Sequence, residues 1–442
     1  MSDPHRRPVV LRGARQVGKT WLVRDLATRS GLQLIELNFE REPRLRKAFA
    51  SNDPTVVLGE LTLLTNREIP VDRSLLFLDE VQAAGELLAK LRWFYEELPA
   101  LPVVAAGSLL EFTLAEHSFS MPVGRISFRH IEPMSFPEFL EAHEQERLVR
   151  LLAKWRPGSR LSAATHESAT QWFHRYAMVG GMPSVVAADV GGRAPHVCRE
   201  LQTELVATYR ADFAKYAGRM DRNVLDSVLA AVAGSIGAKF VYAKVRDGVK
   251  QHQAKHALEL LAAARLCHLV RYSSAREAPL GAEVKDSFRK AVLLDVGILH
   301  ALVGTPAAGA FPTLESLSAS LRNRVCDQLA AQQLRLLNST ADGPQLYYWQ
   351  REGGRSGEVD YIIQVGGAVI PVELKAGVSG SMKSLHQYMY DMRLSRAVRC
   401  DANPPSRSRV EVATTTGDAV SYEMLSVPLY LLWNVGAILS SD

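Results

Sequence analysis

The segment Gly13-Ala14-Arg15-Gln16-Val17-Gly18-Lys19-Thr20 lies between a short apolar run at residues 8–11 and a stretch with apolar residues at helical spacing at 21–27. Strand, glycine loop and helix in this order are the setting of a phosphate-binding loop. The glycines let backbone amides turn inward around phosphates at the positive end of the following helix. We therefore expect these eight residues to bind a nucleotide, with Lys19 on the β- and γ-phosphates and the Thr20 hydroxyl on Mg²⁺.

A second element completes this predicted site. The four apolar residues 75–78 run directly into two carboxylates, Asp79 and Glu80. An apolar run without alternation is typical of a strand buried on both faces of a parallel sheet, and such sheets bind ligands at the carboxyl ends of their strands. We expect Asp79 to hold the magnesium shell and Glu80 to polarise the attacking water, which favours hydrolysis. A strand that ends in a solvated acidic turn is the alternative.

Two further polar residues are candidates for the same site. Ser108 follows another apolar run, residues 101–106, and a side chain at that strand end is placed to sense the γ-phosphate. An ordinary helix-capping serine is the alternative. Arg125 is a candidate arginine finger, acting within its own chain or on a neighbouring copy, and a solvated surface arginine is the alternative.

These motifs resemble those of a known family, the bacterial and archaeal AAA-type ATPases that carry a C-terminal domain of unknown function. The resemblance rests on residues 13–20, 75–82, 106–108, 124–125, 131–139 and 176–183. It implies an α/β fold with ATP and Mg²⁺ as ligands, and a P-loop ATPase domain with a parallel sheet over residues 1–145. A helical lid would follow at 146–220, a winged helix at 221–310, and a restriction-endonuclease-like α/β domain at 311–442.

The last third of the chain carries a second acidic motif. Glu358 and Asp360 lie on an alternating stretch, and a Gly-Gly turn leads to a return strand that runs into Glu373 and Lys375. This arrangement resembles the PD-(D/E)xK nuclease core. Residues two apart on a strand point to the same face, so Asp360 and Glu373 can together hold Mg²⁺ while Lys375 orients or activates water. Glu358 is an extra candidate ligand, and an ion pair at a strand end is the alternative.

The same resemblance raises a difficulty for cleavage. Relatives typically carry a Glu on the helix before these strands, and Arg322 stands at the matching position here. A cation there would repel a metal ion or pair with Asp360 or Glu373, so we expect cleavage to be weak or lost. On the following helix, Gln387 occupies the usual accessory position.

A basic stretch at residues 239–276 suggests a nucleic-acid partner. It holds eight Lys and Arg residues against Asp247 and Glu259, a surplus of six positive charges, whereas the whole chain has a formal charge of +5. Such a local surplus attracts a phosphate backbone and makes binding sensitive to salt. The alternatives are a module that contacts protein and a merely solvated face.

Composition narrows the class of protein. The chain has 442 residues, of which 47 % are hydrophobic, which fits several domains with cores of their own. Its longest apolar run, residues 427–439, is too short for a membrane-spanning helix, and the first residues lack the apolar stretch of a secretory signal. The four cysteines are far apart, as in a reduced cytoplasm. We therefore expect a soluble, cytoplasmic protein without a membrane partner.

Together these patterns predict an ATP-binding and ATP-hydrolysing regulatory protein whose nucleotide state controls C-terminal domains that contact nucleic acid or a protein. A nucleotide-gated adaptor without turnover and an ATP-regulated, Mg²⁺-dependent nuclease are the alternatives. Glu80 favours hydrolysis over the adaptor, and Arg322 counts against the nuclease. The protein partner is not indicated, and a homo-oligomer remains open.

Overall fold

The computed structural model describes residues 6–108, 110, 112, 121–216, 220–307, 311–337, 341, 343–351, 357–375, 377 and 381–441. The chain divides into two compact units. The first holds residues 1–132 with the short segments 263–265 and 339–343, and the second holds the remainder. The finer division into lid, winged helix and nuclease-like domain stays a prediction.

The first unit alternates strands with helices. Its described elements are β1 (Val9–Arg12), α1 (Lys19–Arg29), β2 (Gln33–Asn38), η1 (Pro43–Ala50), α2 (Pro54–Thr65), β3 (Ser74–Asp79), η2 (Val81–Ala84), α3 (Leu87–Glu97), β4 (Val103–Ala106) and β5 (Ser127–His130). The strands form a parallel sheet in the order β2-β3-β4-β1-β5. The predicted parallel α/β sheet is therefore confirmed for this unit.

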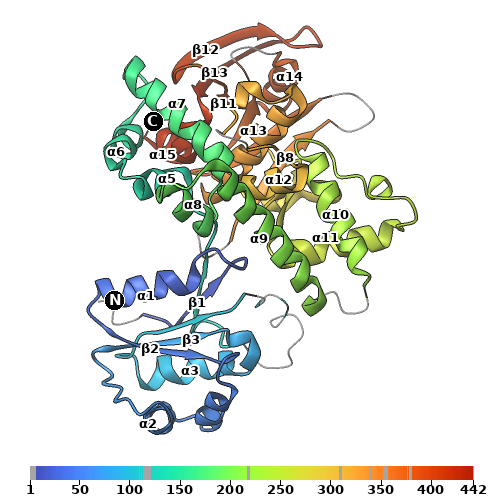
Figure 1. Cartoon of the computed structure of the whole chain (residues 1–442). Coiled ribbons are helices and arrows are strands. Elements are labelled where there is room, and N and C mark those ends of the chain that lie inside the picture. The colour runs from blue at the N-terminus through green and yellow to red at the C-terminus, as the bar shows by residue number, and fades with distance from the viewer. Residues whose placement is uncertain are drawn as a thin grey trace. The chain divides into compact units, whose positions relative to one another are not determined.

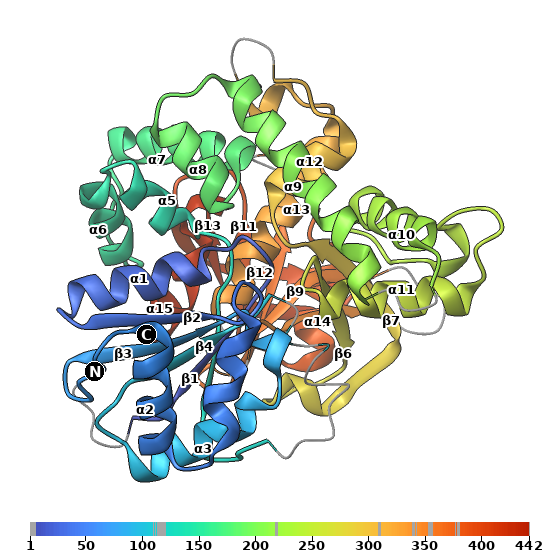
Figure 2. The same ribbon diagram turned by 60° about the horizontal axis from the view of Figure 1, so that its bottom comes forward.

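Both faces of this sheet are covered by helices, as the unbroken apolar run of β3 predicts. Leu75 and Phe77 face the cluster that contains Val23 and Ala27 of α1. The alternate residues of β3 face the larger cluster formed by α2 and α3. Figures 1 and 2 show α1 on one side of the sheet and α2 and α3 on the other. This layering leaves the carboxyl ends of the strands open to ligands.

The second unit contains helices along its whole length. They are α5 (Phe136–Ala142), α6 (Glu146–Lys154), α7 (Ala163–Val179), α8 (Pro183–Val190), α9 (Pro195–Tyr216), α10 (Arg222–Ser235), η3 (Tyr242–Lys244), α11 (Gln251–Ala263), η4 (Leu280–Glu283), α12 (Val296–Val303), η5 (Leu314–Ser316), α13 (Ala319–Leu334), η6 (Arg335–Leu337), α14 (Lys383–Met392), η7 (Leu429–Asn434) and α15 (Val435–Ser440). Between α7 and α8 the helix stops and a new one begins at a Gly180-Gly181 turn.

The strands of the second unit form one eight-stranded mixed sheet in the order β12-β13-β11-β10-β9-β8-β6-β7. They are β6 (Cys267–Ser273), β7 (Val284–Leu293), β8 (Leu346–Gln350), β9 (Glu358–Val365), β10 (Ala368–Leu374), β11 (Arg396–Cys400), β12 (Ser406–Ala413) and β13 (Ala419–Val427). β6 pairs with β8 in parallel. The antiparallel pair of β6 and β7, which lies in the region predicted to be a winged helix, thus extends the sheet that carries the second acidic motif.

The Gly180-Gly181 turn is fixed by close contacts on both sides. A Cβ atom on Gly181 would lie 2.1 Å from the carbonyl oxygen of Met134, and one on Gly180 would lie 2.2 Å from the Asp295 carboxylate. The Gly181 amide donates to Asp295 Oδ2 at 2.7 Å, and its carbonyl accepts from the Met134 amide, also at 2.7 Å. The motif is therefore a packing junction.

Two further findings concern possible membrane-spanning helices and the cysteines. Among the described helices, none has the length and apolarity needed to cross a membrane. All four cysteines are buried free thiols.

Candidate functional site

The glycine loop joins the end of β1 to the start of α1, and its backbone takes left-handed conformations. Gly13 has φ +150° and would bring a Cβ within 2.3 Å of the Ile131 carbonyl oxygen, so only glycine fits there. Gln16 and Gly18 also have positive φ, of 65° and 90°. Interleaved left-handed residues turn successive amides toward a common point and form an anion-binding concavity.

The side chain of Lys19 lies within this loop. Its Nζ donates to the carbonyl oxygens of Gly13 and Ala14, at 3.0 and 2.7 Å. The residue is only 8 % exposed. Burial lowers the pKa of Lys19 to about 8, against the opposing influence of the nearby Glu80 and Asp79 carboxylates. The ammonium is therefore positioned where phosphate oxygens would be received.

Thr20 and Asp79 come together as predicted for a magnesium shell. The Thr20 hydroxyl donates to Asp79 Oδ1 at 3.4 Å, although the two residues lie on α1 and β3. Asn38, the last residue of β2, donates to the other carboxylate oxygen at 3.3 Å. Burial, followed by the charge of Glu80, raises the pKa of Asp79. A divalent cation bound here would offset both the burial of the Asp79 carboxylate and its repulsion by Glu80.

Glu80 lies directly after β3, in a left-handed conformation with φ 50°. Its Oε2 accepts from Gln82 Nε2 at 2.5 Å and from the Ser108 hydroxyl at 3.4 Å. Sequence analysis assigned no role to Gln82 or Asn38, although both stand at or just beyond the carboxyl ends of strands. The structure thus brings Lys19, Thr20, Asp79, Glu80 and Ser108 to one edge of the sheet.

Arg125 is placed elsewhere. Its Nε donates to Glu96 Oε1 at 2.8 Å, and one terminal nitrogen donates to the Val123 carbonyl at 3.3 Å. Arg125 lowers the pKa of this Glu96 carboxylate, which lies on the exposed side of α3. In the described residues, then, Arg125 has no bond to the site at Glu80, and an arginine-finger role stays a prediction.

The second acidic site is formed by adjacent antiparallel strands. Asp360 on β9 accepts from the Leu374 amide of β10 at 2.8 Å. Lys375 Nζ lies 2.7 Å from Glu373 Oε1. Glu373 is 6 % exposed, and its Oε2 is buried without a hydrogen-bond partner among the described residues. Burial, and then the Asp360 charge, raises the pKa of Glu373 to about 7. The three predicted residues are therefore neighbours.

Two residues that the sequence analysis missed join this cluster. Asp327 of α13 is partly buried, and this burial followed by the Asp360 charge raises its pKa to about 7. The Tyr361 hydroxyl donates to Asp327 Oδ1 at 3.3 Å. Lys290 of β7, 2 % exposed, bonds to the Glu358 carboxylate.

The structure corrects the expectation about Arg322. Within the described residues it bonds to neither Asp360 nor Glu373, and the α13 side chain that acts on Asp360 is Asp327. Asp327 is five positions further along the same helix, which is nearly one and a half turns. In the part of the chain that the structure describes, however, no three His, Cys, Asp or Glu side chains are arranged to hold a metal ion.

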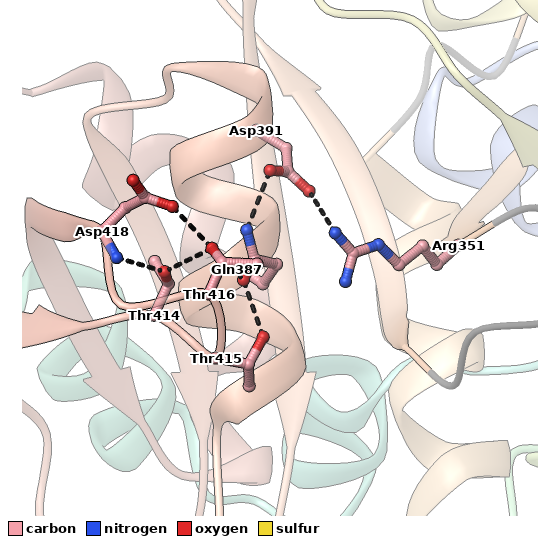
Figure 3. A network of polar contacts seen from close by, with 7 residues as sticks. All are labelled: Arg351, Gln387, Asp391, Thr414, Thr415, Thr416 and Asp418. Carbon is pink, nitrogen blue, oxygen red and sulfur yellow. Dashed lines mark hydrogen bonds and ion pairs between the residues drawn. The ribbon is translucent and has the colours of Figure 1, made fainter.

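Gln387, for which the sequence predicted an accessory position, is hydrogen-bonded to neighbouring side chains, and the accessory role stays a prediction. Figure 3 shows its amide nitrogen donating to Asp391 and its oxygen accepting from Thr415 and Thr416, at 2.9, 2.7 and 3.2 Å. Thr416 also donates to Asp418, and Asp391 lies 3.6 Å from Arg351. The amide oxygen attaches α14 to the turn between β12 and β13, whereas the amide nitrogen bonds within α14.

The Lys and Arg side chains of the basic stretch are exposed, with one exception. Arg265 is partly buried and lies 3.9 Å from Glu132. Three of the cations, Lys239, Lys244 and Arg246, line a surface hollow of about 590 Å³ on the second unit. No acidic residue lines this hollow, whose other lining residues are Ser227, Ala230, Ala231, Gly234, Ser235, Phe240, Val241 and Val245.

Comparison with protein families divides the chain into three parts. Residues 5–140 match a family described as an AAA domain. Residues 170–309 and 322–412 match families described as domains of unknown function, DUF8612 and DUF4143. Residues 5–140 are therefore similar to an AAA domain, and the two regions that follow are similar to families of unknown function. The AAA match supports nucleotide binding by the first region.

Solved structures with distant similarity include a Walker-type ATPase of Pyrococcus abyssi, at 17 % identity and a TM-score of 0.41, which covers 67 % of this chain and 91 % of the other. The ORC2 protein of Aeropyrum pernix, solved as ADPNP-ADP complexes, has 14 % identity, a TM-score of 0.30 and coverages of 73 % and 89 %. Cdc6p of Pyrobaculum aerophilum has 13 % identity, a TM-score of 0.22 and coverages of 73 % and 88 %. No inference is drawn from such low scores. Comparison with curated proteins gave no match.

Proposed function

We propose that the first unit binds ATP with Mg²⁺ and hydrolyses it. The observation that carries the proposal is the Thr20–Asp79 hydrogen bond beside the buried Lys19, because it joins loop, helix and strand end into one site. Lys19 would bind the β- and γ-phosphates, and Thr20 and Asp79 would hold the metal ion. The residues Gly13, Ala14, Arg15, Gln16, Val17 and Gly18 would surround the phosphates with backbone amides.

Glu80 is the proposed base. Its Oε2 is occupied by Gln82 and Ser108, whereas Oε1 has no hydrogen-bond partner among the described residues. A carboxylate fixed through one oxygen can present the other to a water molecule and accept its proton. Ser108 would hold Glu80 in place and sense the γ-phosphate. Arg125 would act only on a neighbouring copy, after release from Glu96.

Steady-state ATP turnover with Mg²⁺ tests this assignment. Glu80→Gln should keep ATP affinity and lose at least 100-fold in turnover, because an amide cannot accept the proton. Glu60→Gln, an exposed change on α2, is the matched control and should leave turnover unchanged. If Glu80→Gln hydrolyses ATP as fast as the parent, the role given to Glu80 is wrong. A parent that binds ATP without turning it over would favour the nucleotide-gated adaptor.

The nucleotide state of this unit would regulate the second unit, which carries the remaining candidate sites. The support is the continuity of the backbone. The Ile131 amide donates to the Arg12 carbonyl beside the glycine loop, and three residues further on the Met134 amide donates to the Gly181 carbonyl. A change at the loop would therefore reach the packing junction at Gly180-Gly181 through three residues. Limited proteolysis of the second unit with and without ATP should show a difference that Lys19→Ala removes.

A second candidate function is Mg²⁺-dependent nucleic-acid cleavage at Asp360, Glu373 and Lys375. The observation that favours it is the charge of the cluster. Four carboxylates, those of Asp327, Glu358, Asp360 and Glu373, face the two ammonium groups of Lys290 and Lys375. An excess of two negative charges in a partly buried cluster is unfavourable unless protons or a divalent cation offset it.

Cleavage is tested with linear, supercoiled and single-stranded DNA in Mg²⁺ or Mn²⁺, with and without ATP. Activity that is lost in Glu373→Ala and kept in Glu411→Ala, an exposed carboxylate of β12, would establish this function. The absence of cleavage in every condition would leave the cluster a structural ion pair, and the ATPase proposal would be unaffected.

A further inference from the structure

A cavity of about 600 Å³ lies within the second unit, where two parallel strands end. Lys375 follows β10 and Asp401 follows β11, and these strands are paired in parallel. The carboxyl ends of parallel strands are a common place for ligands in α/β sheets. α7 and α13 supply two further walls through Phe173 and Arg322. The volume is in the range of small-molecule sites.

Most charges that line this cavity are already paired. Lys375 lies 2.7 Å from Glu373, and Asp401 lies 2.7 Å from Arg399. His174 Nε2 lies 3.5 Å from the Glu315 carboxylate.

Arg322 differs from them. Its side chain has no ion pair or hydrogen bond in the part of the chain that the structure describes, and its Nε is buried without a partner. A buried polar group of this kind is costly unless a partner satisfies it. Arg322 is therefore a cation of the cavity lining without an ion-pair partner, and its planar fork matches a carboxylate or a phosphate.

The remaining walls are largely apolar. Phe173, Leu429 and Tyr430 line the cavity, and these surfaces suit an aromatic or aliphatic body. We propose that this cavity binds a small organic anion, with its apolar body against Phe173 and Tyr430 and its carboxylate or phosphate on Arg322. The site is distinct from the nucleotide loop, and it shares only Lys375 with the acidic cluster.

Binding of simple probes to the full-length protein tests the proposal by ligand-observed NMR or calorimetry. Phenyl phosphate and benzoate represent the two anionic head groups on one aromatic body. Inorganic phosphate supplies only a head group, and benzyl alcohol supplies only a neutral aromatic body. We expect at least one aromatic anion to bind about tenfold more tightly than either half-probe, and the preferred aromatic anion identifies the head group. Equal affinity for all four probes would overturn the proposal.

Substitutions at and near the cavity lining test where the probe binds. Arg322→Gln should weaken binding of the preferred probe roughly tenfold or more, because a charge-assisted hydrogen bond is lost. Arg322→Lys should retain part of the affinity and guards against a folding defect. Arg324→Gln, two residues along α13 and outside the cavity lining, is the matched control and should bind normally. Thr170→Leu should weaken binding by narrowing the cavity without a change of charge.

Two results would show the proposal to be wrong. One is an Arg322→Gln variant that binds the probe as tightly as the parent. The other is loss of probe binding in Lys19→Ala, which would place the probe on the nucleotide loop. Because Lys19→Ala tests the two sites separately, failure of this proposal is distinguishable from failure of the ATPase proposal.

Discussion

Lys19 donates a 2.7 Å hydrogen bond to the carbonyl oxygen of Ala14, five residues earlier in the same loop. The contact holds a nearly buried ammonium at the centre of the left-handed backbone between Gly13 and Gly18. Burial disfavours the charged form of this side chain, whereas the carboxylates of Glu80 and Asp79 favour it. An anion received in the loop would compensate the charge more fully than a carbonyl group can.

The first prediction concerns ATP affinity. Lys19→Ala removes a charge-assisted contact to phosphate, and such contacts are worth about 1.5–3 kcal/mol. Affinity for ATP should therefore fall roughly 10- to 100-fold in a fluorescence or calorimetric titration. Lys47→Ala, an exposed lysine of η1, removes the same charge outside the loop and should bind ATP normally. Equal losses in both variants would mean that net charge, not the loop contact, controls binding.

The second prediction concerns the orientation of Glu80. Gln82 holds the carboxylate through a 2.5 Å hydrogen bond, so Gln82→Ala should free the base to rotate. We expect ATP turnover to fall about tenfold, with affinity for ATP nearly unchanged, because general-base catalysis depends on geometry. Gln33→Ala is the control. Gln33 lies at the start of β2, and its side-chain amide donates to the Glu68 carbonyl. An unchanged turnover number in Gln82→Ala would remove Gln82 from the site.

Sequence analysis found the nucleotide loop because the loop is local. Eight consecutive residues between a strand and a helix leave few other structures for the backbone. Two partners of Asp79 and Glu80 are not local: Asn38 and Ser108 reach them only because β2, β3 and β4 are neighbours in the sheet. Strand order is not encoded in any one stretch, so the role of Asn38 could not be predicted.

The acidic cluster shows the same limit more strongly. Asp360, Glu373 and Lys375 were predicted from a hairpin and a spacing of two, and these are local features. Asp327 and Lys290 were missed because they belong to a helix and a strand far from the hairpin in sequence. Lys290 reaches Glu358 only because β7 pairs with β6, β6 pairs with β8 and β8 pairs with β9.

The third prediction tests the packing junction. Gly181→Ala would place a methyl group 2.1 Å from the Met134 carbonyl oxygen, so the backbone pair must separate. We expect the free energy of unfolding to fall by about 3 kcal/mol, in the range of severe backbone and packing defects. Gly234→Ala on α10 meets no atom within 4 Å and should be neutral or stabilising by up to ~1 kcal/mol. Thermal unfolding of both variants checks this, and similar midpoints would contradict the clash.

The fourth prediction concerns acid stability. Burial lowers the pKa of His300 to about 3, with a smaller contribution from the Arg199 charge. Because its usual pKa is near 6.5, the unfolded chain binds more protons between about pH 3 and 6.5. Stability should therefore fall as the pH drops below 6.5, by up to ~1.4 kcal/mol per pH unit from this residue.

The difference between variant and parent from pH 5.0 to 6.5 isolates this contribution, because the raised carboxylates of Asp327 and Glu373 titrate in both proteins. His300→Gln should be less stable at pH 7.5, because it cannot keep both bonds, to Thr305 and to Ala177. Its stability should nevertheless change less with pH than that of the parent. His252→Gln, an exposed change on α11, should keep the parent slope. A slope in His300→Gln as steep as that of the parent would assign the acid sensitivity to other groups.

The last prediction concerns contact with DNA through the hollow lined by Lys239, Lys244 and Arg246. If this surface follows a phosphate backbone, the logarithm of affinity should fall linearly with the logarithm of salt concentration. Each cation removed from a phosphate should reduce that slope by about one. Lys244→Ala combined with Arg246→Ala should therefore weaken binding at low salt and lower the slope by about two.

A matched pair of changes separates this surface from net charge. Arg407→Ala with Arg409→Ala removes the same charge from β12, where the two arginines pair with Glu423 and Glu411. Fluorescence anisotropy with a duplex should show the parent slope in this control. If both double variants lose affinity equally, the attraction is nonspecific, because the hollow then has no special role. If the parent does not bind DNA at low salt, the basic stretch instead fits a surface that contacts protein.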